Sequence, residues 1–358
     1  MGSRQLQAYD SGGYCDGLFS EEEGRIGMRM FKIWVIGMAV CLFVSGCGRQ
    51  STAAFERKEG KTLYLIALNE EGPYWKPLIQ SAQDQARERG CTLIVKAGLP
   101  GDSSRPQKLI EMVQEAIDQK ADGIAMAALE PEMFDIKAAE AMAAGVKVVT
   151  YDTDIRTYSN RLAYIGTNNY EAGMELGRRG AEDLKARGIT GGRLTAVTYS
   201  GSAQNMTERY KGLKDGFSQS MDQDAAQFTW CTWIINDLSV SRAKEQLETQ
   251  ILSYPDLKAV FTLGTESVIT GTMEAIKFQN LQGTLYHYGF DYSPTLAAGV
   301  DEGLITGIVD QNCQVIGRTL VDKLADAVEG RDLEKEYLID VTWVEAKDIK
   351  AYGEKAER

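Results

Sequence analysis

The sequence predicts an α/β protein made of two doubly wound lobes, each a parallel sheet covered by helices. Short apolar runs alternate with longer amphipathic runs from Lys61 onward. The apolar runs lack the polar alternation of a half-exposed strand, which indicates strands buried on both faces, as in a parallel sheet. Gly90 and Gly145 each stand directly before an expected strand, where glycine ends a preceding helix well.

The first lobe is predicted by the first series of these runs. Its expected strands are Thr62–Leu68, Thr92–Ala97, Gly123–Ala127 and Val146–Tyr151. Its expected helices, which carry apolar residues at helical spacing, are Trp75–Arg89, Pro106–Gln119 and Pro131–Ala144.

A second series of similar length predicts the second lobe. Its expected strands are Arg193–Thr198, Phe228–Ile234, Ala259–Thr262 and Leu285–Phe290. Its expected helices are Asn169–Arg187, Thr207–Met221, Val240–Leu252 and Val268–Phe278. Right-handed crossovers then wind each series into an open sheet with helices on both faces.

Two elements remain after both lobes are complete. They are a helix at Val315–Val328 and a strand-like run at Tyr337–Val344. These two additional elements indicate that the chain returns from the second lobe to the first, so that several linkers join the lobes.

The segment 28–47 predicts export. Two basic residues precede the apolar run Ile33–Val44, and Ser45-Gly46 lead into Cys47. The run is too short to span a bilayer of about 30 Å as a helix, and its order resembles a bacterial lipoprotein signal, whose cysteine is diacylated. The alternatives are an ordinary signal peptide and a buried apolar helix that ends in cysteine.

The flanks of this segment are expected to lie outside the fold. Residues 1–27 precede the signal and are expected to be a mis-called start or added sequence. Residues 28–46 form the signal peptide, and the polar residues 47–60 form a tether to the first strand.

Composition excludes several classes of function. The chain has 39 Lys and Arg against 51 Asp and Glu, a net charge of −12, without basic blocks, which argues against a nucleic-acid partner. His287 is the only histidine, so His-based triads and His-rich metal sites are excluded. Cys91, Cys231 and Cys313 are far apart and form neither a disulfide framework nor a metal motif.

Several motifs, in order and at matching spacings from Lys61 to Gly330, resemble sugar-binding proteins of the ribose-binding type, the solute receptors of bacterial ABC importers. The motifs are Leu68-Asn69 with Pro73-Tyr74-Trp75, GVKVVTYDTD at 145–154, YIGTNNYEAG at 164–173, TERYKG at 207–212, YPDLKAVF at 254–261, YGFD at 288–291 and GIVDQ at 307–311. The spacing is specific for the family and not for the ligand.

The resemblance implies a type I periplasmic binding protein fold, with three hinge crossings near Thr167, Gln311 and Asp340. The N-terminal lobe would be residues 61–167 plus 312–340, and the C-terminal lobe 168–311 plus 341–358. It further implies a monomer without enzymatic activity, cofactor or metal, which buries its ligand between the lobes.

The expected first-lobe site begins after the first strand. A sugar presents hydroxyls around its rim and C–H faces above and below, so a receptor needs planar aromatics and charged acceptors. The resemblance implies that Tyr74 and Trp75 stack on the sugar ring and that Asn69 contacts it. Alternatively, one of the two aromatic residues staples the helix start into the core, and Asn69 forms a turn.

Asp152 ends the fourth strand, at the sheet edge where ligands gather. The family uses this position for ring hydroxyls. Ribose receptors have arginine next, whereas this chain has Thr153 followed by Asp154, an Asp-x-Asp edge that suggests a hexose-like or otherwise polyhydroxylated ligand. A glycosidase is an alternative, but two carboxyls one residue apart cannot by themselves lie on both sides of a glycosidic bond. A calcium site is another alternative, for which few oxygen ligands are available here.

In the second lobe Arg209, Asp291 and Gln311 match ligand contacts of the family. Alternatively, Arg209 is a surface residue at the start of a helix. The alternative for Asp291 is a turn or N-cap role. Further candidates near these edges are Glu130, Thr167, Asn205 and Asp237. For Asn205 and Asp237 the alternative is a loop role.

Two further positions depart from ribose receptors. Gly264 and Ala127 stand where the family has asparagine contacts. A receptor that lacks these amide partners would recognise ribose less well, because buried polar groups of the ligand would be left unpaired. These departures therefore argue against ribose as the ligand and leave the family resemblance intact.

These features predict a membrane-tethered receptor that delivers a monosaccharide-like ligand to an ABC permease. It would work at the outer face of the cytoplasmic membrane or in the periplasm. The alternative output is signalling, with a membrane sensor kinase as partner. A LacI-type regulator would need an N-terminal helix-turn-helix where this chain has an export segment. A carbohydrate-active enzyme would need a nucleophile motif or a separated acid pair, and the sequence offers neither.

Overall fold

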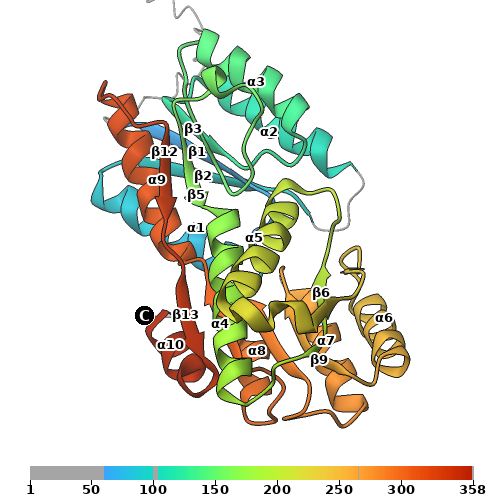
Figure 1. Cartoon of the computed structure of the whole chain (residues 1–358). Helices are drawn as coiled ribbons and strands as arrows, with labels where there is room; N and C mark the ends of the chain where they lie inside the picture. Colours follow the sequence, from blue (N-terminus) through green and yellow to red (C-terminus); the bar gives the residue numbers. More distant parts are fainter. Residues whose placement is uncertain (1–59, 100–103, 265, 357–358) are drawn as a thin grey trace, which may run out of the picture. The chain divides into compact units, whose positions relative to one another are not determined.

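The computed structural model describes residues 60–99, 104–264 and 266–356. The export segment, Cys47 and the tether up to residue 59 lie outside these residues, as does the extension 1–27. The described part contains two parallel-sheet lobes with helices on both faces of each sheet (Figure 1). The predicted α/β fold class is confirmed.

The first sheet has the strand order β12-β5-β4-β3-β1-β2, and all its neighbours run parallel. Its strands are β1 (Thr62–Ala67), β2 (Thr92–Ala97), β3 (Gly123–Met126), β4 (Lys147–Tyr151), β5 (Ala163–Thr167) and β12 (Glu336–Ile339). Its helices are α1 (Trp75–Glu88), α2 (Arg105–Asp118), α3 (Pro131–Ala143) and α9 (Cys313–Val328), with the 3₁₀ turn η1 (Tyr158–Asn160).

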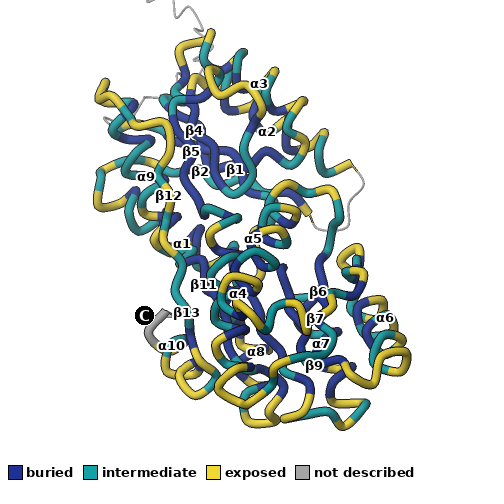
Figure 2. Tube along the Cα trace, in the orientation of Figure 1, coloured by how far each residue is buried: buried dark blue, intermediate teal, exposed yellow. Residues whose placement is uncertain are grey.

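Strand β1 shows why this sheet needs helices on both faces. Its side chains alternate, so Leu63 and Leu65 pack with α1 and α9, whereas Tyr64 and Ile66 pack with α2 and α3. The two leucines and Ile66 are fully buried. Burial of each such side chain contributes roughly 1.5–3 kcal/mol, which holds the strand in the centre of the sheet (Figure 2).

The second sheet has the order β13-β11-β10-β9-β6-β7, and β8 also pairs with β6. Its strands are β6 (Gly192–Thr198), β7 (Phe228–Trp230), β8 (Ile234–Ile235), β9 (Leu257–Thr262), β10 (Tyr286–Phe290), β11 (Gly307–Asp310) and β13 (Thr342–Glu345), of which only β13 runs antiparallel to its neighbour. The helices α4 (Asn169–Ala186) and α5 (Gln204–Met221) cover one face. The other face carries α6 (Val240–Ser253), α7 (Glu266–Phe278), α8 (Pro294–Val300) and α10 (Ile349–Ala356). The turns η2 (Asp222–Gln227) and η3 (Ala346–Asp348) complete the lobe.

The chain passes between the two sheets three times. It leaves β5 for α4, leaves β11 for α9, and runs from β12 directly into β13. The side chain of Asn312 joins the last two crossings, because its amide donates to the carbonyl of Asp340 at 2.6 Å and to Thr342 Oγ1 at 3.1 Å. The carboxyl ends of the strands in both lobes therefore lead toward the crossings.

The prediction of one strand at Phe228–Ile234 is wrong. The structure has two short strands, β7 and β8, with three residues between them. Trp230 and Trp233 both pack on Tyr210, with ring centroids 6.2 and 4.4 Å away. Residues three apart point to opposite faces of a continuous strand, so this shared contact requires the chain to break.

Several short elements were not predicted. They are β5, β11, α8 and α10, and the strand-like run Tyr337–Val344 proves to be two strands in different sheets. Strand β11 has only four residues and begins with glycine, so its sequence carries little periodicity.

Glycines bring the backbones of α4 and α5 into direct contact. A Cβ on Gly177 would lie 2.2 Å from the carbonyl oxygen of Leu213 and 2.6 Å from the amide nitrogen of Phe217. A Cβ on Gly212 would lie 2.0 Å from the carbonyl oxygen of Tyr170. These obstacles are backbone atoms, which cannot move aside as a flexible side chain can.

No helix within residues 60–99, 104–264 and 266–356 combines the length and the apolar character that a membrane span requires.

The α4–α5 contact predicts a large cost for one added methyl group. Gly177→Ala should lower the free energy of unfolding by about 2 kcal/mol, because overpacking outweighs the gain in helix propensity. Urea denaturation measures this. Ser218→Ala, at an exposed position of α5, is the matched control and should change stability by less than about 0.5 kcal/mol. A Gly177→Ala variant as stable as the wild type would contradict the close packing of the two helices.

Candidate functional site

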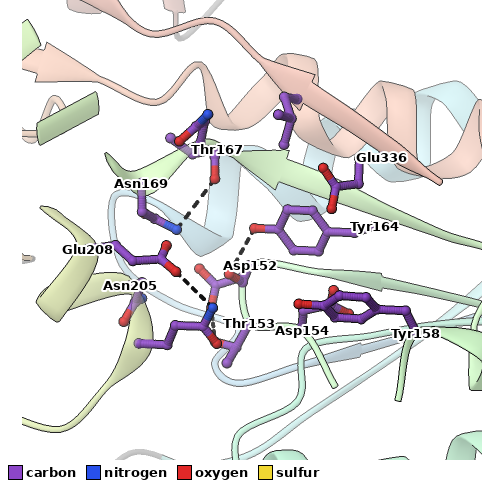
Figure 3. Close-up of a pocket in the computed structure, with 13 residues that line it drawn as sticks. Asp152, Thr153, Asp154, Tyr158, Tyr164, Thr167, Asn169, Asn205, Glu208 and Glu336 are labelled. Carbon is purple, nitrogen blue, oxygen red and sulfur yellow. Dashed lines mark hydrogen bonds between the residues drawn. The ribbon is translucent and has the colours of Figure 1, made fainter. Parts of the chain in front are cut away.

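A cavity of about 220 Å³ lies where β4 and β5 end and α5 begins. Its lining residues come from both lobes and are mostly polar (Figure 3). They are Asp152, Thr153, Asp154, Tyr158, Tyr164, Thr167, Asn168, Asn169, Gln204, Asn205, Glu208, Glu336 and Leu338. The wall offers many hydrogen-bonding groups at fixed positions, which suits a small polar ligand.

Asp152 lies at the carboxyl end of β4, in the left-handed backbone region with φ 58°. Aspartate tolerates this conformation better than most residues, and such strain concentrates at functional sites. The Tyr164 hydroxyl donates to the carbonyl oxygen of Asp152 at 3.2 Å, and Thr153 Oγ1 donates to its carboxylate at 3.1 Å (Figure 3). Burial raises the pKa of Asp152, while Arg209 opposes that shift.

Tyr74 lies next to the same carboxylate. It is buried, occupies the N-cap position of α1 and lies within hydrogen-bonding reach of Asp152. Its ring packs edge-on against Trp75, with centroids 5.1 Å apart, and Trp75 packs likewise against Tyr151 at 6.1 Å. Burial raises the pKa of Tyr74, and the nearby carboxylates of Asp152 and Asp291 raise it further. Tyr74 thus lies near acidic groups from both lobes, and its side chain makes no capping hydrogen bond at the start of α1.

Arg209 of α5 is the most constrained side chain of the site. It is only 4% exposed, so it is not the surface arginine of the alternative interpretation. Its guanidinium donates to Asn169 Oδ1 and to the carbonyl of Leu263, each at 2.9 Å, and to the side-chain oxygen of Gln311. The same group lies 4.3 Å above the ring centroid of Phe290. Asn169 comes directly after the first crossing and Leu263 directly after β9, whereas Gln311 lies in the second crossing and Phe290 is the last residue of β10.

Asp291 extends these contacts into the Arg209 network, which we define as Arg209, Asn169, Gln311 and Asp291. The Gln311 side chain donates to Asp291 at 2.6 Å and its backbone amide donates at 3.1 Å. Asp291 has φ 61°, the same left-handed conformation as Asp152. Burial, with Asp310 close by, raises the pKa of Asp291 to about 7, although Arg209 opposes this. The N-cap of α8 is Ser293, so Asp291 is not the N-cap that the alternative interpretation named.

Asp154 is paired within the first lobe. Its carboxylate accepts from the buried guanidinium of Arg161 at 2.6 Å and from the backbone amide of Ile155 at 2.9 Å. Thr150 Oγ1 also donates to it. Asp154 lines the cavity, but most of its acceptor capacity is satisfied by the protein.

Thr167 and Asn205 also line the cavity. The Thr167 hydroxyl is buried and has no hydrogen-bond partner among the described residues. Asn205 Oδ1 accepts from the amide of Met206 at 3.0 Å and from the Tyr199 hydroxyl at 3.3 Å. Thr167 is therefore the wall residue with the clearest unused hydrogen-bonding capacity.

Four of the twelve predicted contacts line this cavity, and the other eight do not; those eight are Tyr74, Trp75, Arg209, Asp291, Gln311, Asn69, Glu130 and Asp237. The last three are also engaged or exposed elsewhere. Asn69 Oδ1 accepts from the amide of Glu71 at 3.1 Å, which is the turn interaction named as its alternative. Glu130 is exposed at the N-cap position of α3. Asp237 is exposed and pairs with Arg242. Their roles in ligand binding remain predictions.

Several wall residues were not predicted from the sequence. Tyr164 and Asn169 lie inside the quoted motif 164–173, and Glu208 directly precedes Arg209 in the motif 207–212. The motifs were therefore a usable signal for these three. Glu336 lies on β12, whose place at the sheet edge no local pattern indicated.

Among the residues that the structure describes, no group of three His, Cys, Asp or Glu side chains is arranged to hold a metal ion. The histidine is structural: His287 is buried in β10, where its ring nitrogens hydrogen-bond Thr262 at 2.9 Å and the carbonyl of Leu304 at 3.0 Å. Burial lowers its pKa to about 4, so the ring is neutral at neutral pH. The described site thus offers donors and acceptors for a polar ligand.

Comparison with known proteins places this geometry in a family. The model of the periplasmic binding protein domain matches residues 63–332. The xylose/arabinose-binding protein XylF of Sulfolobus acidocaldarius is 24% identical over 268 residues, which cover 71% of this chain. The chain spans 63% of the length of that relative.

Two solved structures have the same fold. GanP, a glucose-galactose binding protein from Geobacillus stearothermophilus, is 25% identical with a TM-score of 0.71, and the match covers 82% of this chain and 99% of GanP. XylFII in its complex with LytSN is 24% identical with a TM-score of 0.69, and the match covers 82% of this chain and all of that one.

The raised pKa of Asp291 predicts a pH-dependent stability. The folded state holds the proton more tightly than the unfolded state, so the free energy of unfolding should fall as pH rises from about 4 to 7. Each unit of pKa difference is worth about 1.36 kcal/mol. Asp291→Asn keeps the side-chain shape and should remove this decline.

Urea denaturation at several pH values, compared with the wild type, measures the effect. Asp256→Asn, at an exposed position, is the control and should parallel the wild type. If Asp291→Asn also paralleled it, Asp291 would not carry the shifted pKa.

Proposed function

We propose that this chain, which belongs to the periplasmic binding protein family, is an extracytoplasmic receptor for a monosaccharide or a similar polyhydroxylated ligand. The ligand would bind between the two lobes. One observation carries the proposal: the carboxylate of Asp152 and the Arg209 network, which come from different lobes, meet beside one polar cavity. Tyr74 and Trp75 supply the aromatic surface that a sugar face requires.

The mechanism that follows is binding coupled to hinge closure, a motion known for periplasmic binding proteins as a class. A ligand would first occupy one lobe of the open receptor. Closure would then bring the other lobe over it and exclude water, which strengthens charged hydrogen bonds to hydroxyl groups. Asp152 would accept from hydroxyls on one side, and Arg209 and Asp291 would pair with groups on the other.

The lobe boundaries of the sequence analysis belong to this proposal. The N-terminal lobe would be residues 61–167 plus 312–340, and the C-terminal lobe 168–311 plus 341–358. The passage of the chain from β5 to α4, from β11 to α9 and from β12 to β13 supports these boundaries.

We further propose that the receptor is a lipoprotein. The order of basic, apolar and small residues before Cys47 supports a diacylated N-terminus there. Residues 47–60 would tether a monomer to the outer face of the cytoplasmic membrane. It would deliver its ligand to an ABC permease and catalyse no reaction, without cofactor, metal or nucleic acid.

The alternative output is signalling. The structural similarity to XylFII in its complex with LytSN favours keeping this candidate. In that case the closed receptor would be recognised by a membrane sensor kinase. Binding of the ligand would be the same step in both outputs, so it is the step to test first.

Sugar binding should be visible as thermal stabilisation. Xylose, arabinose, ribose, glucose and galactose form the first panel for differential scanning fluorimetry. A ligand at 100 times its dissociation constant stabilises the folded state by about 2.7 kcal/mol. Asp152→Asn should abolish the shift without unfolding the protein, because it removes a charged acceptor and tolerates the same backbone conformation.

Asp118→Asn, at an exposed position of α2, is the matched control and should retain the full shift. Wild-type affinity in Asp152→Asn would contradict the proposed site. A response to amino acids or peptides, with none to any sugar or polyol, would contradict the proposed ligand class.

A further inference from the structure

Arg161 is a buried charge that the proposed binding mechanism does not use. It is 1% exposed, stands two residues before β5 and is not among the residues that line the cavity. Burying a guanidinium is costly unless its donors are satisfied. Its partners therefore indicate what this charge does.

All three nitrogens of the Arg161 guanidinium bind groups of the first lobe. Nε donates to the two carboxylate oxygens of Asp154 at 2.8 and 3.0 Å, and one terminal nitrogen donates to the same carboxylate at 2.6 Å. The other terminal nitrogen donates to the backbone carbonyl of Lys335 at 2.7 Å. Every nitrogen of this side chain is thus bound to the protein itself.

The side chains that contact Arg161 form part of the cavity wall. Asp154 lines the cavity, as do Tyr158 and Tyr164. The ring centroids of the two tyrosines lie 4.9 and 6.0 Å from the guanidinium carbon. Asp154, Tyr158 and Tyr164 all lie on the same side of Asp152 (Figure 3). One buried group therefore contacts three residues of this side of the wall.

The Lys335 carbonyl extends these contacts to the edge strand. It stands directly before β12 and also accepts from the backbone amide of Tyr164 at 3.0 Å. Strand β12 contributes Glu336 and Leu338 to the wall and then runs into β13 through the third crossing. Arg161 therefore joins the loop between β4 and β5 to the strand that forms the next part of the wall.

The loop between β4 and β5, residues 152–162, depends on side-chain contacts of this kind. Its outer part is held against α3, where Arg156 pairs with Glu132, and Thr157 and Asn160 bind Asp135. The Arg161 contacts hold its inner part, which faces the cavity. A wall that moves must be ordered when a ligand binds, and that ordering lowers the affinity.

We propose that Arg161 is a positioning residue for ligand binding, which fixes the first-lobe wall of the cavity from behind and does not touch the ligand. It acts through Asp154, the two tyrosines and the backbone at Lys335, so that the wall has its binding geometry before the ligand arrives. Asp154 is then the counter-charge of Arg161 rather than an acceptor for the ligand. This inference rests on the proposed function and names a residue that supports the same site.

Two substitutions change Arg161 and no residue of the wall. Arg161→Lys keeps the charge but has a single nitrogen, which cannot reproduce the fork that binds Asp154 and the Lys335 carbonyl together. Arg161→Gln removes the charge, while Asp154 keeps the backbone amide of Ile155 as a donor.

Isothermal titration calorimetry of the full chain measures the effect, with D-xylose, L-arabinose, D-ribose, D-glucose and D-galactose as probes. The affinity for the sugar that binds the wild type should fall at least tenfold in Arg161→Lys and further in Arg161→Gln. Melting curves without sugar check that each variant is folded.

Two controls separate position from stability. Arg193 has a similar environment, since it pairs with Asp256 at 2.9 Å and lies 4.7 Å from the ring centroid of Tyr254, but it belongs to the second lobe and does not line the cavity. Arg193→Lys should therefore keep the wild-type affinity. Val113→Ala, in the buried face of α2, should lower the melting temperature and also keep the affinity.

Hydrogen exchange without sugar gives a measurement that does not depend on the ligand. In Arg161→Lys the backbone amides of residues 152–162 and 335–339 should exchange faster than in the wild type, because the two segments lose their common partner. The amides of β6 should exchange at the wild-type rate.

Three results would overturn the inference. Wild-type affinity in a folded Arg161→Lys or Arg161→Gln variant, or unchanged exchange in both segments, would reject the positioning role and leave the receptor function intact. If neither variant folds, or if Val113→Ala loses as much affinity as Arg161→Lys, Arg161 serves stability alone. If no sugar of the panel binds the wild-type chain, the proposed function fails and the inference fails with it.

Discussion

The position of one buried guanidinium constrains the rest of the site. Arg209 binds Asn169 after the first crossing, the carbonyl of Leu263 after β9 and Gln311 in the second crossing. Asn312 links the second crossing to the third. A buried arginine is stable only when its donors are satisfied, so these segments must keep their relative positions. The helix that carries Arg209 can reach them because Gly173 of α4 lacks a side chain; a Cβ there would lie 2.2 Å from the Arg209 carbonyl.

Each lobe places one acidic residue of the site in the same backbone conformation. Asp152 and Asp291 each end a central strand of a doubly wound sheet in the left-handed conformation. In such sheets, ligands bind outside the carboxyl ends of the strands. Burial raises the pKa of both carboxyls, and Arg209 counteracts the shift in each case. The arginine thus limits the rise in pKa of two buried acids while it also supports the crossings.

Much of the fold could be predicted from the sequence, because long buried strands and amphipathic helices carry strong periodicity. The predicted strand Thr92–Ala97 matches β2 residue for residue. Short strands such as β5 and β11 could not be predicted, since four or five residues carry little pattern and their pairing depends on distant strands. The same limit applied to the site: Asp154 lines the cavity as a carboxylate, but nothing in its local pattern indicated that Arg161 would pair with it.

The central claim is that one ligand is held between the two lobes by Asp152 and the Arg209 network. A crystal structure of the chain with the sugar that gives the largest thermal shift tests it most directly. The account predicts ligand oxygens or nitrogens within about 2.7–3.2 Å of Asp152 on one side and of Arg209, Asp291 or Gln311 on the other. A ligand that contacts one lobe only, or that lies outside the cleft, would contradict it.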